Sequence, residues 1–122
     1  MLQNKNGSIY EGMTNAELKV AKFLTDNDIY WKFEQAVYIT DDKGRPRVWT
    51  PDFYLPELGI YVEVCGTDKF DYEFRKNIYY DNKIPIIFVH AYKEDKWGDY
   101  LIKEIQNIHE KRWELIKSLD YT

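Results

Sequence analysis

Two acidic residues, Asp52 and Glu63, are placed in the sequence so that they could share a divalent metal ion. Asp52 follows Thr50-Pro51, and ten residues separate it from Glu63. If the segments on either side of the loop at residues 56–59 pair as antiparallel strands, the two carboxylates lie side by side on one face. Mg²⁺ and Mn²⁺ bind few carboxylate oxygens and complete their coordination with waters and substrate phosphate. The pair therefore predicts a divalent-metal site, although either acid alone is consistent with a turn or a hydrogen-bonded structural role.

Two further groups could complete such a site. The carbonyl of Val64 would add a neutral oxygen, and Glu17 would add a third carboxylate if the first helix packs beside the strand ends. One Mg²⁺ largely offsets the charge of three carboxylates, and two reverse its sign, which suits binding of a phosphodiester. Glu17 has a second interpretation, because Thr14 and Glu17 have the S/T-x-x-E spacing of a helix capping box. Both roles stay open at this point.

Hydrophobic periodicity predicts the elements that hold these residues. The capping box begins a helix that ends near Asn27, and residues 30–40 alternate as a strand. A turn at residues 41–44 leads to a second extended segment at residues 47–54, which forms a hairpin with the first. Residues 60–65 alternate as a third strand. The two acids are thus placed on the second and third strands.

The second half of the chain alternates helix and strand. Residues 70–82 have helical periodicity, and residues 84–90 form a continuous apolar run. Such a run is typical of a strand that is buried on both faces and pairs in parallel after a helical crossover. Residues 97–119 form a long amphipathic helix. The order α-β-β-β-α-β-α predicts an α/β fold, a mixed sheet flanked by helices, in one domain at residues 13–122 that follows a polar tail at residues 1–12.

The motif region resembles a known nuclease superfamily. The string TPDFYLPELGIYVEVCG and the element order around it resemble the PD-(D/E)XK superfamily, the restriction-endonuclease-like fold, over residues 17–89. They are most similar to small phage junction-resolving and transposon-end endonucleases. The resemblance implies an α-β-β-β-α-β core, to which this chain adds a C-terminal helix. It also implies Mg²⁺- or Mn²⁺-dependent hydrolysis of DNA phosphodiester bonds by an activated water, with Asp52 and Glu63 as metal ligands and Glu17 as the acid from the first helix.

Cys65 stands where the superfamily has a lysine, two residues after the second acid. That lysine helps to orient or deprotonate the water, and a neutral thiol is neither a cation nor a good base near pH 7. Lys69, Arg75 or Lys76 could supply the cation instead. The alternative function is therefore a nuclease-fold module with weak or no catalysis that binds nucleic acid or a protein partner. A third interpretation is a thiol enzyme using Cys65 and His90, although no protease signature surrounds the cysteine.

Basic and aromatic side chains supply candidate contacts to DNA, either duplex or branched. Lys43, Arg45 and Arg47 lie in the predicted first hairpin, which could hold backbone phosphates, and Arg75 is a further candidate. The aromatic residues, 17% of the chain, are expected to serve mostly in core packing, and some could provide stacking platforms for unpaired bases. The candidates for stacking are Tyr30, Trp31, Tyr79 and Tyr80. The net charge of −4 argues against nonspecific binding through bulk positive charge, but acids that hold metal ions make an empty nuclease site negative.

Composition predicts where the protein resides and with what it associates. No apolar run approaches the length of a membrane span, and the first ten residues lack the apolar segment of an export signal. The single cysteine excludes an intrachain disulfide and fits a reducing compartment. We therefore expect a soluble cytoplasmic protein without membrane association. The apolar stripe of the terminal helix could support a homodimer.

Overall fold

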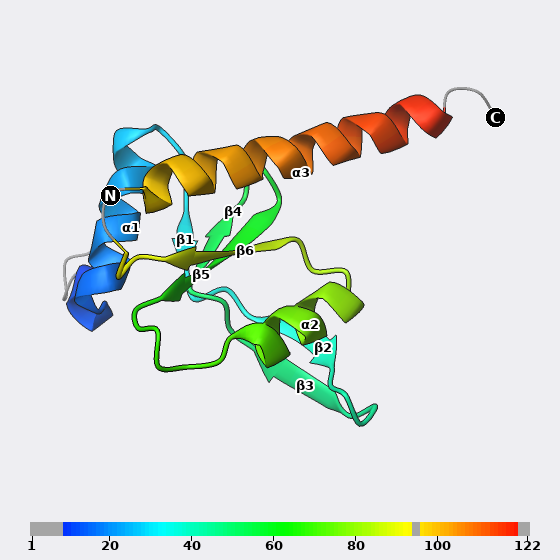
Figure 1. The fold of residues 1–122 in the computed structure, drawn as a ribbon, viewed down its shortest axis with the longest axis horizontal. Helices are drawn as coiled ribbons and strands as arrows, with labels where there is room; N and C mark the ends of the chain where they lie inside the picture. The colour runs from blue at the N-terminus through cyan, green and yellow to red at the C-terminus, as the bar shows by residue number, and fades with distance from the viewer. Residues whose placement is uncertain (1–8, 94–95, 120–122) are drawn as a thin grey trace.

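The computed structural model describes residues 9–93 and 96–119. Of the predicted polar tail at residues 1–12, residues 1–8 lie outside the described residues. Figure 1 shows how the elements are arranged. In chain order they are the 3-10 helix η1 (Ile9–Gly12), α1 (Asn15–Asp26), β1 (Lys32–Phe33), β2 (Val37–Thr40), β3 (Pro46–Trp49), β4 (Phe53–Leu55), β5 (Ile60–Cys65), α2 (Glu73–Asp81), β6 (Ile86–His90) and α3 (Trp97–Leu119). None of the helices in these ranges has the length and hydropathy that a membrane span would need.

Four strands form one mixed sheet in the order β1-β4-β5-β6. β1, β4 and β5 are antiparallel neighbours, whereas β5 and β6 are parallel, with Tyr61 opposite Ile86 and Cys65 opposite His90. α2 joins the parallel pair, because parallel neighbours need a crossover connection. The predicted α/β class, with a mixed sheet, flanking helices and a C-terminal helix, is confirmed, and so is the parallel pairing of the predicted strand at residues 84–90.

The two faces of this sheet carry different layers, and Figure 1 shows α3 on one side and α2 with the β2–β3 hairpin on the other. α1 and α3 bury apolar side chains against one face, around Phe53, Val62 and Val89. α2 and the hairpin cover the other face, around Cys65 and Tyr79. Alternation along β5 explains the division, because successive side chains of a strand point to opposite faces.

Neither of the predicted long strands, at residues 30–40 and 47–54, is continuous. The first is interrupted at Glu34, whose φ of 59° lies in the left-handed region, and the second at Pro51, which has no N–H to donate to a ladder. The N–H of Glu34 donates to the carbonyl of Asp52 (2.8 Å), so the two interruptions lie side by side. As a result β1 and β4 stay in the main sheet, while β2 and β3 form a separate two-stranded sheet. The predicted hairpin itself is confirmed.

Side-chain oxygens fix the first turn of two helices. The N–H of Glu17 donates to Thr14 Oγ1 (3.2 Å), and the N–H of Thr14 donates to Glu17 Oε1 (2.9 Å), so the predicted capping box of α1 is confirmed. α2 begins at Glu73, three residues later than predicted, and the N–H of Glu73 donates to Asp71 Oδ1 (2.9 Å). N–H groups that have no partner within the helix are thereby satisfied.

The predicted apolar stripe of α3 continues past the sheet. Ile105 and Ile108 pack against the core, whereas Trp113, Leu115 and Ile116 are exposed. Figure 1 shows the end of α3 extending beyond the rest of the fold. The homodimer suggested by this stripe stays a prediction.

Candidate active site

β4 and β5 place the two predicted acids next to each other. Phe53 lies opposite Val62 in the antiparallel register, so the next pair along that register is Asp52 and Glu63. The N–H of Val64 donates to Asp52 Oδ2 (2.7 Å), which ties the Asp52 carboxylate to β5. Glu63 is only 6% exposed. The structure thus brings the two acids together, as their spacing predicts.

Glu17, the third predicted acid, lies near this pair. The start of α1 packs against the end of β5, since a Cβ added to Gly66 would lie 3.6 Å from Ala16 Cβ. The negative charge of Glu17 raises the pKa of Asp52 and that of Glu63. The same carboxylate accepts the capping-box hydrogen bond. The two interpretations of Glu17 are therefore compatible, because one side chain caps α1 and adds negative charge to the site.

Burial and like charge raise the pKa of the two central acids. Burial is the largest cause of the raised pKa of Asp52, about 7, and the Glu63 carboxylate is the next. Burial also raises the pKa of Glu63, against the opposing charge of Arg75. Crowded carboxyl groups cannot all ionise at low cost unless a cation joins them. Binding of a divalent ion here would therefore be accompanied by release of a proton.

We predict that Asp52 makes the protein less stable as the pH rises. Its usual pKa is about 4 and its folded pKa about 7, so between these values the folded state keeps a proton that the unfolded chain has released. The free energy of unfolding of the wild type should therefore fall over this range relative to that of Asp52→Asn, which has no such proton. Thermal denaturation of both proteins in EDTA measures the difference. Parallel pH profiles would contradict the raised pKa.

Arg75, on α2, brings positive charge to these acids. Its Nη2 lies 3.0 Å from Glu63 Oε2, and its guanidinium lies over the ring of Trp49, 5.4 Å from the centroid. Lys69 and Lys76 are exposed, and neither takes part in an ion pair within residues 9–93 and 96–119. Of the three cations that the sequence offered, Arg75 is thus the one that the structure brings to the acids.

One buried polar atom at this ion pair, Glu63 Oε1, has no hydrogen-bond partner among the described residues. Buried polar atoms are nearly always paired, so an unpaired one marks a place for a water or an ion. Glu63 Oε1 is an acceptor and suits a cation. The Val64 carbonyl lies on the same side, because the N–H and C=O of one strand residue point the same way and this N–H points to Asp52.

The donor atoms fit a hard divalent cation that uses few protein ligands. In the part of the chain that the structure describes, no three His, Cys, Asp or Glu side chains form a ready-made metal-binding group. Mg²⁺ does not need one, because it keeps several waters and uses one or two carboxylates. Asp52, Glu63 and the Val64 carbonyl provide that number of oxygen donors. These residues therefore fit Mg²⁺ or Mn²⁺.

Cys65 is fully buried in the layer between the sheet and α2. Burial, followed by the charge of Glu63, raises the pKa of its thiol to about 12. The thiol therefore stays protonated at neutral pH, whereas a nucleophilic cysteine needs the thiolate. His90 lies opposite Cys65 in the register of β5 and β6, and burial lowers the pKa of His90. A thiol enzyme is thus disfavoured, and Cys65 acts as a small core residue.

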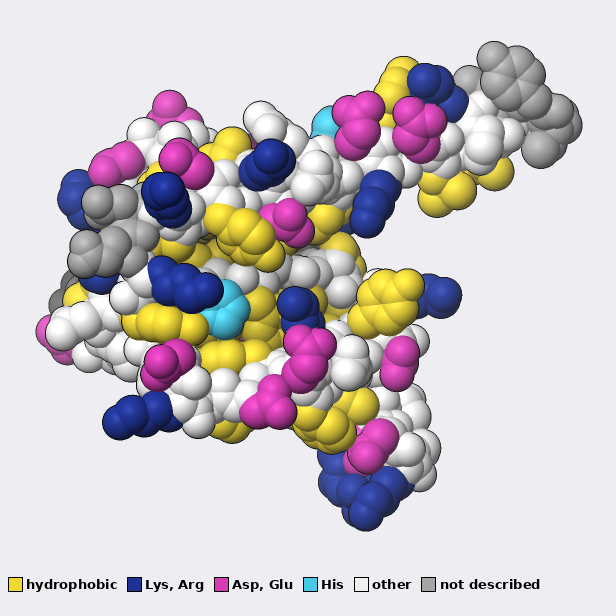
Figure 2. Space-filling view, viewed as in Figure 1, with side chains coloured by type: hydrophobic (Ala, Val, Ile, Leu, Met, Phe, Trp, Pro, Cys, Tyr) yellow, Lys and Arg dark blue, Asp and Glu magenta, His cyan; other side chains and the backbone are white. Residues whose placement is uncertain are grey.

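The basic cluster of the hairpin lies apart from the acids, at the projecting tip between β2 and β3 (Figure 1 and Figure 2). Asp41 Oδ2 accepts from Arg45 Nε (3.0 Å) and Arg47 Nε (3.2 Å). Asp41 Oδ1 accepts from the N–H groups of Lys43 and Arg45, both at 2.9 Å. These bonds, led by the one from the Arg45 N–H, hold the pKa of Asp41 well below its usual range. The sequence interpretation missed this role of Asp41, although an Asp that begins a turn is its usual signal.

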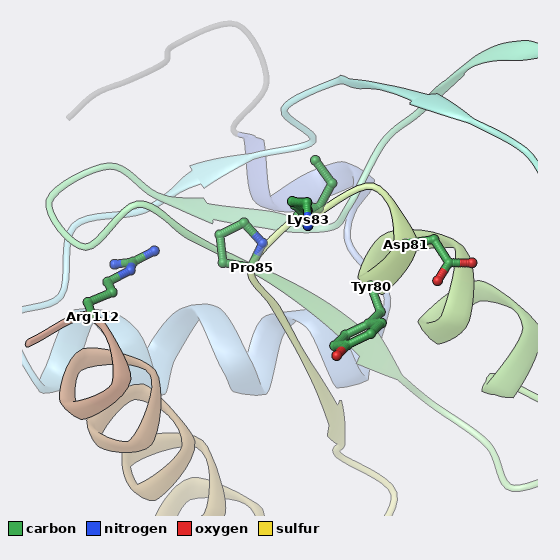
Figure 3. Close-up of a pocket in the computed structure, with 6 residues that line it drawn as sticks. Tyr80, Asp81, Lys83, Pro85 and Arg112 are labelled. Atoms are coloured by element: carbon green, nitrogen blue, oxygen red, sulfur yellow. The ribbon is translucent and has the colours of Figure 1, made fainter. Parts of the chain in front are cut away.

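A surface pocket of about 600 Å³ lies at the other end of β6 (Figure 3). Its lining residues are Tyr80, Asp81, Lys83, Ile84, Pro85 and Arg112. The guanidinium of Arg112 is held in place because it donates to the carbonyls of Leu58 and Gly59. Cys65 and His90 pair at the opposite end of β5 and β6, so this pocket is separate from the acidic pair.

The aromatic stacking candidates have different environments. Tyr79 is fully buried and packs edge-on against Trp49 at 5.2 Å, so its interpretation as a stacking platform is wrong. Trp31 is half-buried and packs against Phe53 at 5.3 Å. Tyr30 and Tyr80 are exposed, as a platform would require.

No protein-family model, curated protein or solved structure matches this chain. Evidence for its function therefore comes from the residues of the site. The acidic pair, Arg75 and the basic hairpin are the features that bear on it.

Proposed function

We propose that the protein is a metal-dependent endonuclease that hydrolyses phosphodiester bonds in DNA. The observation that carries this proposal is the adjacent pair of Asp52 and Glu63, with Glu17 beside it and a buried Glu63 oxygen that has no partner among the described residues. The element order supports it. The resemblance to the PD-(D/E)XK superfamily implies a core of the order α-β-β-β-α-β. This chain follows that order with α1, the antiparallel strands β1, β4 and β5, then α2 and the parallel strand β6. The β2–β3 hairpin is inserted between β1 and β4.

In this proposal Asp52, Glu63 and the Val64 carbonyl hold Mg²⁺ or Mn²⁺. The bound metal would activate a water and offset negative charge on the phosphodiester. The Val64 N–H fixes one oxygen of Asp52 and leaves its other oxygen for the cation. Glu17 adds a third negative charge, which strengthens the attraction of the site for a divalent ion.

Arg75 compensates for the lysine that Cys65 replaces. Its guanidinium lies 3.0 Å from Glu63, so it can stabilise negative charge on a phosphate bound beside the acids. A guanidinium has five N–H donors, so the contact with Glu63 leaves others for a phosphate oxygen. Stacking on the ring of Trp49 restricts its motion.

Cleavage of labelled DNA tests the proposal. Linear duplex, single-stranded and branched substrates are incubated with Mg²⁺, Mn²⁺ or EDTA, and the products are separated on denaturing gels. We expect cleavage of at least one substrate with either metal and none in EDTA. Folded wild-type protein that cleaves none of them with either metal would contradict the proposal.

A second candidate function is favoured by the burial of Cys65. A protonated thiol in place of the lysine supplies no charge to the reaction, so the chain could be a nuclease-fold module that binds nucleic acid or a protein partner without strong catalysis. The variant Cys65→Lys separates the two functions. Activity that is absent from the wild type and present in this variant would indicate a metal site that lacks its cation. Inactivity of both proteins, with DNA binding retained, would support the binding module.

The hairpin is expected to hold backbone phosphates of duplex DNA. Lys43→Ala and Arg45→Ala should each weaken binding and reduce the slope of log affinity against log salt concentration by about one per lost phosphate contact. Fluorescence anisotropy in EDTA at several salt concentrations measures this slope. Lys22→Ala, on the exposed face of α1, is the matched control and should leave it unchanged. Unchanged slopes in both hairpin variants would show that the phosphate contacts lie elsewhere.

A further inference from the structure

Four aromatic rings form a continuous row at the carboxyl end of β6. The ring centroids of Phe70 and Tyr72 lie 4.8 Å apart, those of Tyr72 and His90 5.8 Å, and those of His90 and Tyr92 5.5 Å. Each contact is edge-to-face, which is a favourable geometry for aromatic pairs. The row therefore joins the segment before α2 to the end of β6. We call Phe70, Tyr72, His90 and Tyr92 the aromatic row.

The two ends of the aromatic row are open to solvent. Phe70 is 50% exposed and Tyr92 is 36% exposed, whereas Tyr72 and His90 are half-buried. Tyr72 also packs against the buried Phe88, with ring centroids 6.2 Å apart, so the middle of the row is anchored on the core. Figure 2 shows hydrophobic side chains beside a histidine on this face. Exposed rings at both ends are more than core packing requires.

Lysines from three segments surround the aromatic row. Lys19 Nζ, on α1, donates to the carbonyl of Ala91, the residue after His90 (3.4 Å). Lys93 lies one turn further on, where its N–H donates to the carbonyl of His90 (3.1 Å). Burial lowers the pKa of His90, and the positive charges of Lys93 and Lys76 lower it further, which places both lysines near its ring. Aromatic rings flanked by lysines are the combination that binds single-stranded nucleic acid, because bases stack on the rings and phosphates pair with the cations.

The aromatic row adjoins the acidic pair. His90 lies opposite Cys65 in the parallel register of β5 and β6, and Glu63 precedes Cys65 by two residues on the same face of the sheet. A strand whose phosphate reaches Glu63 therefore passes close to the row. Neighbouring nucleotides of that strand can reach the exposed rings only if their bases are unpaired, because bases inside a duplex are stacked on one another.

We propose that the aromatic row binds unpaired bases next to the cleaved phosphodiester, so that the substrate is DNA with a single-stranded segment, such as a tailed or branched duplex. This inference rests on the proposed nuclease function and adds the substrate class. Stacking on Phe70 and Tyr92 positions the strand, while Lys19 and Lys93 pair with its phosphates. A blunt duplex offers no free base faces except at its ends, so it gains nothing from the row.

Binding measured without cleavage tests the row. Fluorescein-labelled DNA, either a blunt duplex or the same duplex with a ten-nucleotide tail (about the span of one single-strand binding groove), is titrated with protein in EDTA. We expect the double variant Phe70→Ala/Tyr92→Ala to lose about tenfold or more in affinity for the tailed DNA and to bind the blunt duplex as the wild type does. Tyr92→Phe, which keeps the ring, should bind as the wild type does. Trp113→Ala is the matched control, because Trp113 is an exposed ring (54%) towards the end of α3, away from the aromatic row.

The outcomes separate this inference from the nuclease proposal. Any of three results would overturn the inference. The double variant could lose affinity equally for both DNAs or lose it for neither, or the wild type could show no preference for tailed DNA. A row that binds a protein partner and no DNA would show no loss of affinity for either DNA. Circular dichroism checks that the variants are folded, and Phe70→Leu, which keeps the bulk without the ring, should lose affinity for tailed DNA as Phe70→Ala does. Selective binding of tailed DNA by a wild type that cleaves nothing in Mg²⁺ or Mn²⁺ would refute the nuclease function and leave the row as a single-strand binding site.

Discussion

Asp52→Asn is expected to lower metal-dependent DNA cleavage by at least about a thousandfold while the fold stays intact. The substitution removes one negative charge and a carboxylate donor from the acidic pair, and a metal ion contributes several kcal/mol to stabilising the transition state. The amide that replaces the carboxylate keeps an oxygen that accepts from the N–H of Val64, so the link between β4 and β5 survives. Single-turnover cleavage rates with Mg²⁺ and Mn²⁺ measure the loss.

The matched control for this prediction is Asp26→Asn. Asp26 is an exposed acid at the end of α1, where it pairs with Lys22, and its substitution should leave the cleavage rate unchanged. Combining Asp52→Asn with Glu63→Gln should cost little more than either change alone, because residues that act as a unit are not additive. A folded Asp52→Asn protein that cleaves at the wild-type rate would show that Asp52 has no part in the reaction.

Arg75→Ala is expected to lower the free energy of unfolding by about 2–4 kcal/mol. The change leaves the Glu63 carboxylate buried without its cation and removes the stacking on Trp49. Removing one partner of a fully buried ion pair would lower the free energy of unfolding further, but the Arg75 side chain is partly exposed. Saturating Mn²⁺ should restore part of the loss, because it supplies positive charge to Glu63 in the folded state only. Chemical denaturation with and without Mn²⁺ measures both effects.

Lys76→Ala is the control for this second prediction. Lys76 is the next cation on α2, it is exposed, and its loss should change stability by no more than about 0.5 kcal/mol. Arg75→Lys keeps the charge but not the planar guanidinium, so an intermediate loss is expected. Equal stability of Arg75→Ala and Lys76→Ala would contradict the importance of the pair with Glu63.

Local signals account for the elements that were predicted correctly. The capping box depends only on Thr14 and Glu17, three residues apart, so it was readable in the sequence. β5 and α3 follow from alternation and helical periodicity, and both were predicted with the bounds that they have. The parallel pairing of β6 follows from the preceding helix and the continuous apolar run.

The interrupted strands could not be predicted from alternation. Phe33 and Val37 have the same parity, so the pattern continues through Glu34 as it would in an unbroken strand. The interruption instead depends on the hydrogen bond from the N–H of Glu34 to the carbonyl of Asp52, which joins segments far apart in the sequence. Sequence periodicity contains no information on such a contact.

The site was predictable only where the backbone alone decides it. A short loop between β4 and β5 fixes their register, and the register places Asp52 beside Glu63. Two other features depend instead on how α2 and its preceding segment pack against the sheet. They are the pairing of Arg75 with Glu63 and the contacts of the aromatic row that join Phe70 to Tyr92. The sequence shows a cysteine, Cys65, two residues after Glu63, but it does not show which cation reaches the acids.

Location of bound Mn²⁺ by NMR tests the proposed metal site most directly, because it needs no knowledge of the DNA substrate. Paramagnetic Mn²⁺ broadens the amide signals of residues close to it in ¹⁵N-labelled protein. We predict that substoichiometric Mn²⁺ broadens the signals of Asp52, Glu63 and Val64 first in the wild type, and that this selective broadening is lost in Asp52→Asn. Broadening centred elsewhere, or the same pattern in both proteins, would contradict a metal site at the acidic pair.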